Sequence, residues 1–265
     1  MSSSSPEGRL LVDEPAPHVA RLVISNPAKR GALDQAILDR FAELMPALDA
    51  RCVIITGEEQ IFSAGYDISG LPENAPADDA QRLVAHPFTA AIEAIEAYPY
   101  PTVAALNGHT IGGGLELALS CDLRIASDAI KLAMPPAKLG LIYSHTGIKK
   151  FVDAIGAPRT RELFFLGSTI DAVTAHDWGL VNRIVAADLL ADEALSVAGQ
   201  IAANAPLSQR GNKRVIATVL AAQGALRPDV ERELIEFRLD GFASDDFREG
   251  VRAFAEKRKP TWQGR

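Results

Sequence analysis

Residues 101–127 read PTVAALNGHTIGGGLELALSCDLRIAS, and this stretch carries the clearest indication of fold in the chain. Residues 102–106 form a short apolar run that predicts a buried strand, and an Asn-Gly turn signal ends it. A glycine triplet at 112–114 then opens residues 115–120, which predict a helix. A buried strand, a glycine turn and a helix in this order indicate an α/β core.

The glycine triplet has two possible explanations. Gly112, Gly113 and Gly114 let the backbone approach a ligand closely and adopt positive φ angles. Unpaired N–H groups at a helix start suit a developing oxyanion. The other explanation is a close-packing turn with no ligand, and the triplet alone leaves both open. The nucleotide-binding pattern G-x-G-x-x-G is excluded, because Leu117 occupies its last glycine position, and no GK[ST] follows.

Glu116 follows the triplet by two residues, within an otherwise apolar helical turn. A buried carboxylate is unfavourable unless it is paired or functional. Burial raises the pKa of a carboxyl group and makes it a better general acid or base. The alternative is a glutamate that turns outward or pairs with an arginine.

The remaining sequence extends the α/β pattern and then becomes helical. Residues 18–25 and 52–56 predict strands, and Asp34 is a plausible N-cap for a helix over 34–49. Further helices are predicted over 78–97, 159–166, 172–178, 187–203, 207–222, 230–242 and from Ser244 to about 257. We therefore expect an α/β core followed by helices that pack on it or on a neighbouring subunit.

Composition excludes several classes of protein. The net charge of −7 disfavours a nucleic-acid-binding protein. Cys52 and Cys121 form no CxxC pair, so we expect neither a disulfide framework nor a structural zinc site. We expect the protein to reside in a reducing compartment. The N-terminus lacks the features of a secretory signal, and no apolar run is long enough to span a membrane. We expect a cytoplasmic protein with no membrane partner, in which residues 1–14 form a disordered lead.

Two motifs, taken together, resemble the crotonase (enoyl-CoA hydratase/isomerase) superfamily. Residues 62–67 read F-x-A-G-x-D, and residues 107–122 read N-G-x-x-x-G-G-G-x-E-L-A-L-x-C-D. The segments NPAKRGAL at 26–33, WGLVNRIV at 178–185 and FAEKRKPTWQGR at 254–265 agree with the same family. The resemblance implies a crotonase-like spiral of ββα units over 15–200 and a helical trimerisation region over 201–265, in a homotrimer or homohexamer.

The resemblance also implies a site for an acyl-CoA substrate. Members of the superfamily stabilise a thioester enolate with two backbone N–H groups, which fall here at Tyr66 and Gly113, and Glu116 falls at a catalytic carboxylate. Coenzyme A is part of the substrate, and no metal or redox cofactor is implied. The positions that match substrate- or CoA-binding segments are Arg30, Ala32, Ala64, Asp67, Ile68, Gly112, Pro135, Pro136, Phe254 and Lys257.

One departure from the family pattern bears on the reaction. Hydratases with two glutamates carry the second where this chain has Pro136, and proline cannot hold a water or move a proton. Residues 134–148, M-x-P-x-x-L-G-x-x-Y-x-x-x-G-I, instead resemble the methylmalonyl-CoA decarboxylases. In such an enzyme Tyr143 would orient the leaving carboxylate or protonate the enolate; alternatively Tyr143 only shapes the pocket.

Three functions therefore remain open. The first is a hydratase/isomerase-type enzyme that uses Glu116 as its acid or base. The second is a decarboxylase of short 2-carboxyacyl-CoA substrates that uses Tyr143. The third is an acyl-CoA-binding protein without turnover, which the retained Glu116 disfavours.

Overall fold

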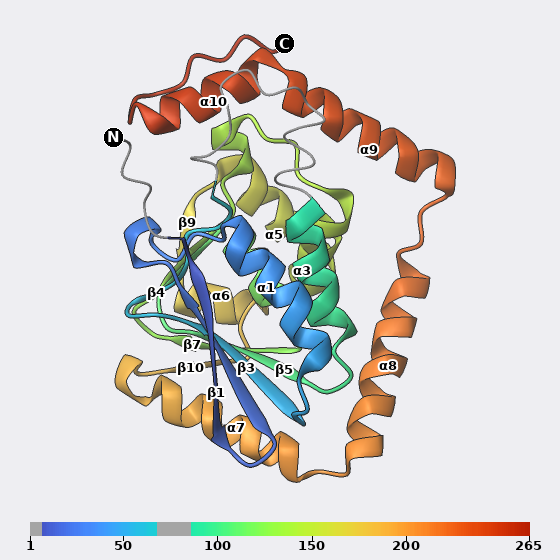
Figure 1. The fold of residues 1–265 in the computed structure, drawn as a ribbon. Coiled ribbons are helices and arrows are strands. Elements are labelled where there is room, and N and C mark those ends of the chain that lie inside the picture. Colours follow the sequence, from blue (N-terminus) through green and yellow to red (C-terminus); the bar gives the residue numbers. More distant parts are fainter. Residues whose placement is uncertain (1–6, 68–85) are drawn as a thin grey trace.

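Two sheets of mainly parallel strands form the centre of the computed structural model, which describes residues 7–67 and 86–265 (Figure 1). The first sheet has the strand order β1-β2-β3-β5-β7-β10. Its strands are β1 (Arg9–Ala16), β2 (Val19–Ser25), β3 (Cys52–Gly57), β5 (Thr102–Leu106), β7 (Leu123–Ser127) and β10 (Arg183–Val185). The second sheet has the order β4-β6-β8-β9, made by β4 (Ile61–Ser63), β6 (His109–Ile111), β8 (Lys131–Ala133) and β9 (Thr169–Asp171).

The apolar strands of the first sheet are buried on both faces. Along β3, Val53 and Ile55 join the main core, whereas Cys52 and Ile54 face the helix α7 (Leu190–Ala203). A strand covered on both faces needs apolar residues at every position, which explains the continuous run CVII. Figure 1 shows α7 on one side of this sheet and α1 (Gln35–Leu44) and α3 (His86–Ala97) on the other.

The order of elements repeats along the chain. A strand of the first sheet is followed by a strand of the second sheet and then a helix in β3-β4-α3, in β5-β6-α4 with α4 (Gly113–Leu119), and in β7-β8-α5 with α5 (His145–Leu166). Parallel pairing joins β3 to β5 and β5 to β7, with Val53 opposite Thr102 and Val103 opposite Leu123. The predicted spiral of ββα units is confirmed.

Local capping signals predicted two helix starts correctly. The Asp34 carboxylate accepts a hydrogen bond from the Ile37 N–H at 3.1 Å, and the Ser244 hydroxyl accepts one from the Phe247 N–H at 3.0 Å. The predicted helix over 159–166 is the second part of α5, which Gly156 interrupts with φ 73°. Of the helix predicted over 78–97, residues 78–85 lie outside the described residues.

The disordered lead predicted over 1–14 is wrong for residues 9–14. These residues form most of β1, which pairs antiparallel with β2 from Arg9 opposite Ser25 to Asp13 opposite Arg21. The sequence RLLVDEPA lacks an alternating pattern because most of β1 is exposed on both faces, and the successive residues Leu11 and Val12 both stay exposed.

The C-terminal helices leave the core and return to it. Helix α8 (Pro206–Gln223) contains no buried residue and runs along the edge of the molecule (Figure 1). It meets the core through polar contacts, such as the ion pair between Lys213 and Asp122 at 2.7 Å. Helices α9 (Pro228–Ala243) and α10 (Asp245–Ala255) fold back, and α10 packs on the short 3₁₀ helix η4 (Pro136–Leu139).

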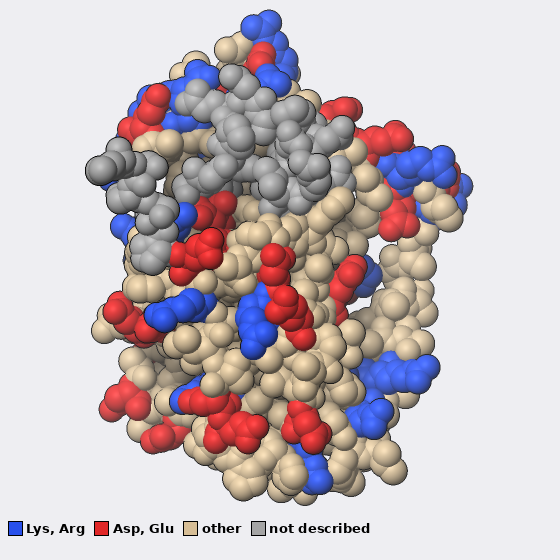
Figure 2. Space-filling view, in the orientation of Figure 1, with Lys and Arg blue, Asp and Glu red and all other residues tan. Residues whose placement is uncertain are grey.

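Acidic and basic side chains are interspersed on the face shown in Figure 2. Within the described part of the chain, no helix is long and apolar enough to cross a membrane.

The contact between α10 and η4 depends on a residue without a side chain. A Cβ atom at Gly250 would lie 2.3 Å from the Leu139 carbonyl oxygen. We expect Gly250→Ala to lower the free energy of unfolding by about 1–3 kcal/mol, because backbone must shift to accept the methyl group. Urea unfolding followed by circular dichroism measures the change.

Gly199 in α7 provides the matched control, because it also lies within a helix. A Cβ atom at Gly199 would have no described neighbour within 4 Å apart from its own helix. Gly199→Ala should raise the free energy of unfolding by about 0.5–1 kcal/mol. Equal effects of the two substitutions would contradict the packing of α10 on η4.

Candidate active site

The turn that follows β4 is fixed by a second segment of backbone. The Leu33 N–H donates to the Gly65 carbonyl at 2.8 Å, and the Asp67 N–H donates to the Leu33 carbonyl at 3.1 Å. The Ser63 hydroxyl donates to the Gly31 carbonyl at 2.8 Å. These bonds hold residues 63–67 as a short ladder beside residues 31–33, so the position of each N–H group in the turn is set by the fold.

This turn lies directly against the start of α4. A Cβ atom at Gly65, where φ is 94°, would lie 2.8 Å from the Ile111 carbonyl oxygen and 3.2 Å from the Gly113 nitrogen. A Cβ atom at Gly113 would lie 3.4 Å from the Tyr66 nitrogen. Gly112 makes the sharp turn into α4 with φ 55° and ψ −122°. The backbone nitrogens of Tyr66 and Gly113 are therefore close neighbours.

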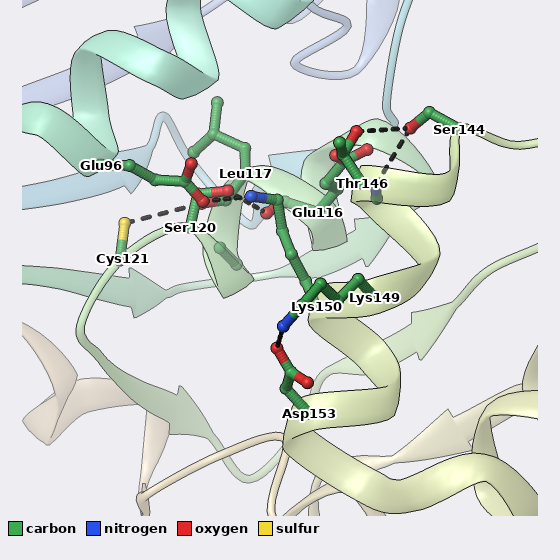
Figure 3. Close-up of polar contacts among 12 residues, drawn as sticks. Glu96, Glu116, Leu117, Ser120, Cys121, Ser144, Thr146, Lys149, Lys150 and Asp153 are labelled. Carbon is green, nitrogen blue, oxygen red and sulfur yellow. Dashed lines mark hydrogen bonds and ion pairs between the residues drawn. The ribbon is translucent and has the colours of Figure 1, made fainter. Parts of the chain in front are cut away.

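Glu116 lies one turn further along α4 and is buried, with 5% of its surface exposed. The Tyr143 hydroxyl donates a hydrogen bond to Oε2 of this carboxylate. The Tyr143 ring packs edge-on against Phe164 at 5.6 Å, and it fits over Gly147, where a Cβ atom would lie 2.6 Å from the ring. Figure 3 shows Glu116 beside the first turn of α5. The fold thus joins two predicted site residues that the sequence separates.

Burial sets the protonation of this pair. Removal from water raises the pKa of Glu116, while the Tyr143 hydrogen bond and the positive charges of Lys150 and Arg238 act in the opposite direction. Burial, followed by the charge of Glu116, raises the pKa of Tyr143 well above its ordinary value. Tyr143 is therefore a neutral hydrogen-bond donor, and Glu116 holds its proton to a higher pH than an exposed glutamate.

Two basic residues near the pair were missed by the sequence analysis. Lys150 of α5 forms an ion pair with Glu96 of α3 close to Glu116 (Figure 3). Arg238 of α9 acts electrostatically on both Glu116 and Tyr143. No local pattern marks either residue, because each lies in a helix with several other charges and gains its environment only through tertiary packing.

The residues predicted near coenzyme A lie in three places. Arg30, with φ 54°, and the buried Ala32 belong to the segment beside the 63–67 turn, and Ala64 is exposed within that turn. The Asp67 carboxylate accepts from the Lys29 Nζ at 2.6 Å. Ile68 lies outside the described residues.

The other predicted binding residues belong to η4 and α10. Pro135 precedes η4, and the buried Pro136 is its first residue. Phe254 and Lys257 lie at the exposed C-terminal end of α10 and just beyond it. The structure thus brings together the segments around residues 31–33, 63–67, 112–116 and 143, while the side chain of Phe254 lies in solvent.

Comparison with known proteins gives matches over nearly the whole chain. A family model described as enoyl-CoA hydratase/isomerase matches residues 15–265. The enoyl-CoA isomerase/hydratase fer4 of Mycosarcoma maydis is 31% identical over 260 residues, which cover 93% of this chain and 93% of that protein.

Solved structures match equally completely. Methylmalonyl-CoA decarboxylase in complex with 2-nitronate-propionyl-CoA has a TM-score of 0.88 at 27% identity, covering 99% of this chain and 100% of the other. An enoyl-CoA hydratase/isomerase from Pseudoalteromonas atlantica T6c has a TM-score of 0.81 at 28% identity, covering 96% of this chain and 99% of the other.

The raised pKa of Glu116 has a consequence for stability. At a pH below its ordinary pKa of 4.5, Glu116 is protonated in both the folded and the unfolded state, so its ionisation does not lower the free energy of unfolding. As the pH rises, the unfolded state loses this proton first, and folding then opposes ionisation. The variant Glu116→Gln keeps an acceptor for Tyr143 and cannot ionise. We expect its free energy of unfolding to rise relative to wild type as the pH goes from about 4 to about 8. The gain is about 1.4 kcal/mol for each tenfold difference in proton affinity of Glu116 between the folded and unfolded states.

Chemical unfolding of both proteins at the two pH values measures this difference, since other titrating groups cancel between them. A Glu116→Gln effect that is the same at both pH values would show that the folded state does not hold the Glu116 proton more tightly than the unfolded state does.

Proposed function

The chain belongs to the enoyl-CoA hydratase/isomerase (crotonase) family, whose members act on acyl-CoA, and we propose that it stabilises a thioester enolate between the N–H groups of Tyr66 and Gly113. The support for this role is the neighbouring position of the two nitrogens and the need for glycine at 65 and 112, where φ is positive. Two donors aimed at one oxygen stabilise the negative charge that develops there, and one such donor is typically worth about 3–4 kcal/mol.

The reaction that the site supports best is decarboxylation of a short 2-carboxyacyl-CoA such as methylmalonyl-CoA. The observation that carries this proposal is the hydrogen bond from Tyr143 to the buried Glu116. It occupies the one carboxylate that hydration would use, and Pro136 offers no second carboxylate. The similarity to methylmalonyl-CoA decarboxylase over 99% of the chain supports the same reaction.

The proposed steps balance without a cofactor. The bond between C2 and the substrate carboxylate breaks, carbon dioxide leaves, and the bonding electrons form the thioester enolate in the Tyr66 and Gly113 hole. Before this step, Glu116 holds the Tyr143 hydroxyl in place through the hydrogen bond that it accepts. The O–H then turns from Glu116 to the enolate and gives its proton to C2, and the resulting phenolate recovers a proton from solvent.

A second candidate reaction is isomerisation of an enoyl-CoA by Glu116 alone. It is favoured by the burial of this carboxylate, which raises its pKa and suits it to move one proton between C2 and C4. In this reaction Tyr143 serves only to shape the pocket and to tune Glu116.

Incubation with methylmalonyl-CoA tests the proposal directly. We expect propionyl-CoA, measured by mass spectrometry, and a fall in kcat of about 10²–10⁴-fold in Tyr143→Phe because the proton donor is lost. Tyr100→Phe is the matched control, since Tyr100 is also partly buried and lies outside this pair. Turnover of 3-enoyl-CoA without release of propionyl-CoA would favour the isomerase.

The proposed oxyanion hole, formed by the N–H groups of Tyr66 and Gly113, is tested by a pair of substitutions at Gly113, the first residue of α4. Proline is well tolerated at this helix position but removes the N–H group, whereas alanine keeps the N–H and adds a Cβ near the Phe88 ring. We expect Gly113→Pro to lower kcat by about 10²–10³-fold relative to Gly113→Ala. Equal activity of the two variants would exclude Gly113 as an oxyanion donor.

The exposed apolar side chains of α8 support a homotrimer or homohexamer. Val215, Ile216, Val219 and Leu220 share one face of this helix and are each at least 43% exposed. Such a row of apolar residues favours contact with another protein surface. The family resemblance points to further copies of this chain as that surface.

Light scattering after size exclusion should therefore give the mass of three or six chains. Ile216→Glu with Val219→Glu should lower the mass to one chain, because charges would be buried at the contact. Ala221→Glu, on the other side of α8, is the control and should leave the assembly intact. A monomeric wild type would overturn this proposal.

A further inference from the structure

Arg238 has a buried donor that the described residues leave unused. Its Nε atom is shielded from solvent, and no described residue accepts a hydrogen bond from it. The guanidinium lies 5.4 Å from the centre of the Phe242 ring, and burial lowers its pKa. An arginine remains charged in proteins, so a buried N–H without an acceptor is unfavourable and calls for an explanation.

The packing of α9 places Arg238 near the segment that carries Tyr143. A Cβ atom at Gly241 would lie 2.8 Å from the side chain of Ile142, the residue before Tyr143. His145 Nε2 lies 3.4 Å from the Glu231 carboxylate at the other end of α9. Helix α9 is thus fixed across the segment that carries Tyr143. The charge of Arg238 accordingly acts on both Tyr143 and Glu116.

The missing acceptor is best supplied by a ligand. A guanidinium is planar and matches a carboxylate with two parallel hydrogen bonds. The nearby Glu116 carboxylate already accepts from Tyr143, and the thioester oxygen belongs to the hole at Tyr66 and Gly113 in the proposed function. We propose that Arg238 binds a carboxylate carried by the acyl group. The site would then select acyl-CoA esters whose acyl chain bears a free carboxylate in addition to the thioester. This inference rests on the proposed function for its placement of the acyl group.

The charges around the pair agree with this assignment. A substrate carboxylate near Glu116 would meet a second negative charge, and two carboxylates in one site repel each other. Arg238 offsets this repulsion from α9, and Lys150 contributes positive charge from α5, where it is already paired with Glu96. The bound carboxylate also favours the protonated form of Glu116.

Arg238 should act on binding more than on the chemical step. During decarboxylation the carboxylate leaves as neutral carbon dioxide, so its contact with Arg238 weakens as the reaction proceeds. Only contacts that strengthen in the transition state raise kcat. Loss of Arg238 should therefore raise KM for methylmalonyl-CoA without a matching fall in kcat.

Two inert thioethers of coenzyme A separate binding from turnover. The first, 2-carboxypropyl-CoA, carries a carboxylate, and isobutyl-CoA carries a methyl group in its place. By calorimetry, wild type should bind the carboxylate probe more tightly by about tenfold or more, and Arg238→Met should weaken that probe by roughly 10- to 100-fold while leaving isobutyl-CoA unchanged. Arg238→Lys should recover part of the preference.

Arg232→Met is the matched control, because Arg232 lies on the same helix and is exposed. It should change the affinity for neither probe. An equal loss of both probes in Arg238→Met would assign Arg238 a structural role and overturn the inference. Wild type that binds both probes equally, or that fails to bind the carboxylate probe, would also overturn it.

The two experiments distinguish failure of the carboxylate site from failure of the proposed function. An Arg238-dependent preference without release of propionyl-CoA from methylmalonyl-CoA would reject decarboxylation and keep the carboxylate site. Release of propionyl-CoA with KM unchanged in Arg238→Met would keep decarboxylation and reject the carboxylate site.

Discussion

The close approach of two backbone turns is the constraint on which the candidate site depends. Gly65 packs against the carbonyl of Ile111 and the nitrogen of Gly113 at distances that exclude a side chain. The ladder to Leu33 fixes one turn, and the Gly112 N–H, which donates to the Ala133 carbonyl at 2.9 Å, fixes the other. The fold therefore fixes the positions of the Tyr66 and Gly113 N–H groups relative to each other.

Electrostatic balance is the second constraint on the site. Glu116 is buried and carries a raised pKa, and its partner Tyr143 is held neutral by burial and by the same carboxylate. Positive charge comes from α5 and α9, which are different parts of the chain. The turns that carry Tyr66 and Gly113, and Lys150 on α5, thus belong to the ββα spiral, whereas Arg238 is added by α9, which packs on the spiral later in the sequence.

Sequence alone predicted those features that depend on local or motif-level signals. Asp34 and Ser244 were recognised as helix caps because a cap needs only its own turn, and the glycines at 65 and 112–114 were recognised because they stand in a specific paired motif. The hydrogen bond between Tyr143 and Glu116 was not predictable, since the distance between them is set by the packing of α4 on α5. Strand β1 was missed because its exposed edge has no period-two pattern, and Arg238 was missed because its burial depends on α9.

The exposed path of α8 has a consequence for the order in which the site is completed. Because α8 buries none of its own residues and meets the core through polar contacts such as Lys213 with Asp122, α9 and α10 dock through their own contacts at Ile142 and Leu139. Because translation proceeds from the N-terminus, Tyr66, Gly113, Glu116 and Tyr143 leave the ribosome before Arg238 does. The backbone segments of the candidate site are therefore synthesised before Arg238, whose guanidinium can join them only after α9 has been made and has docked.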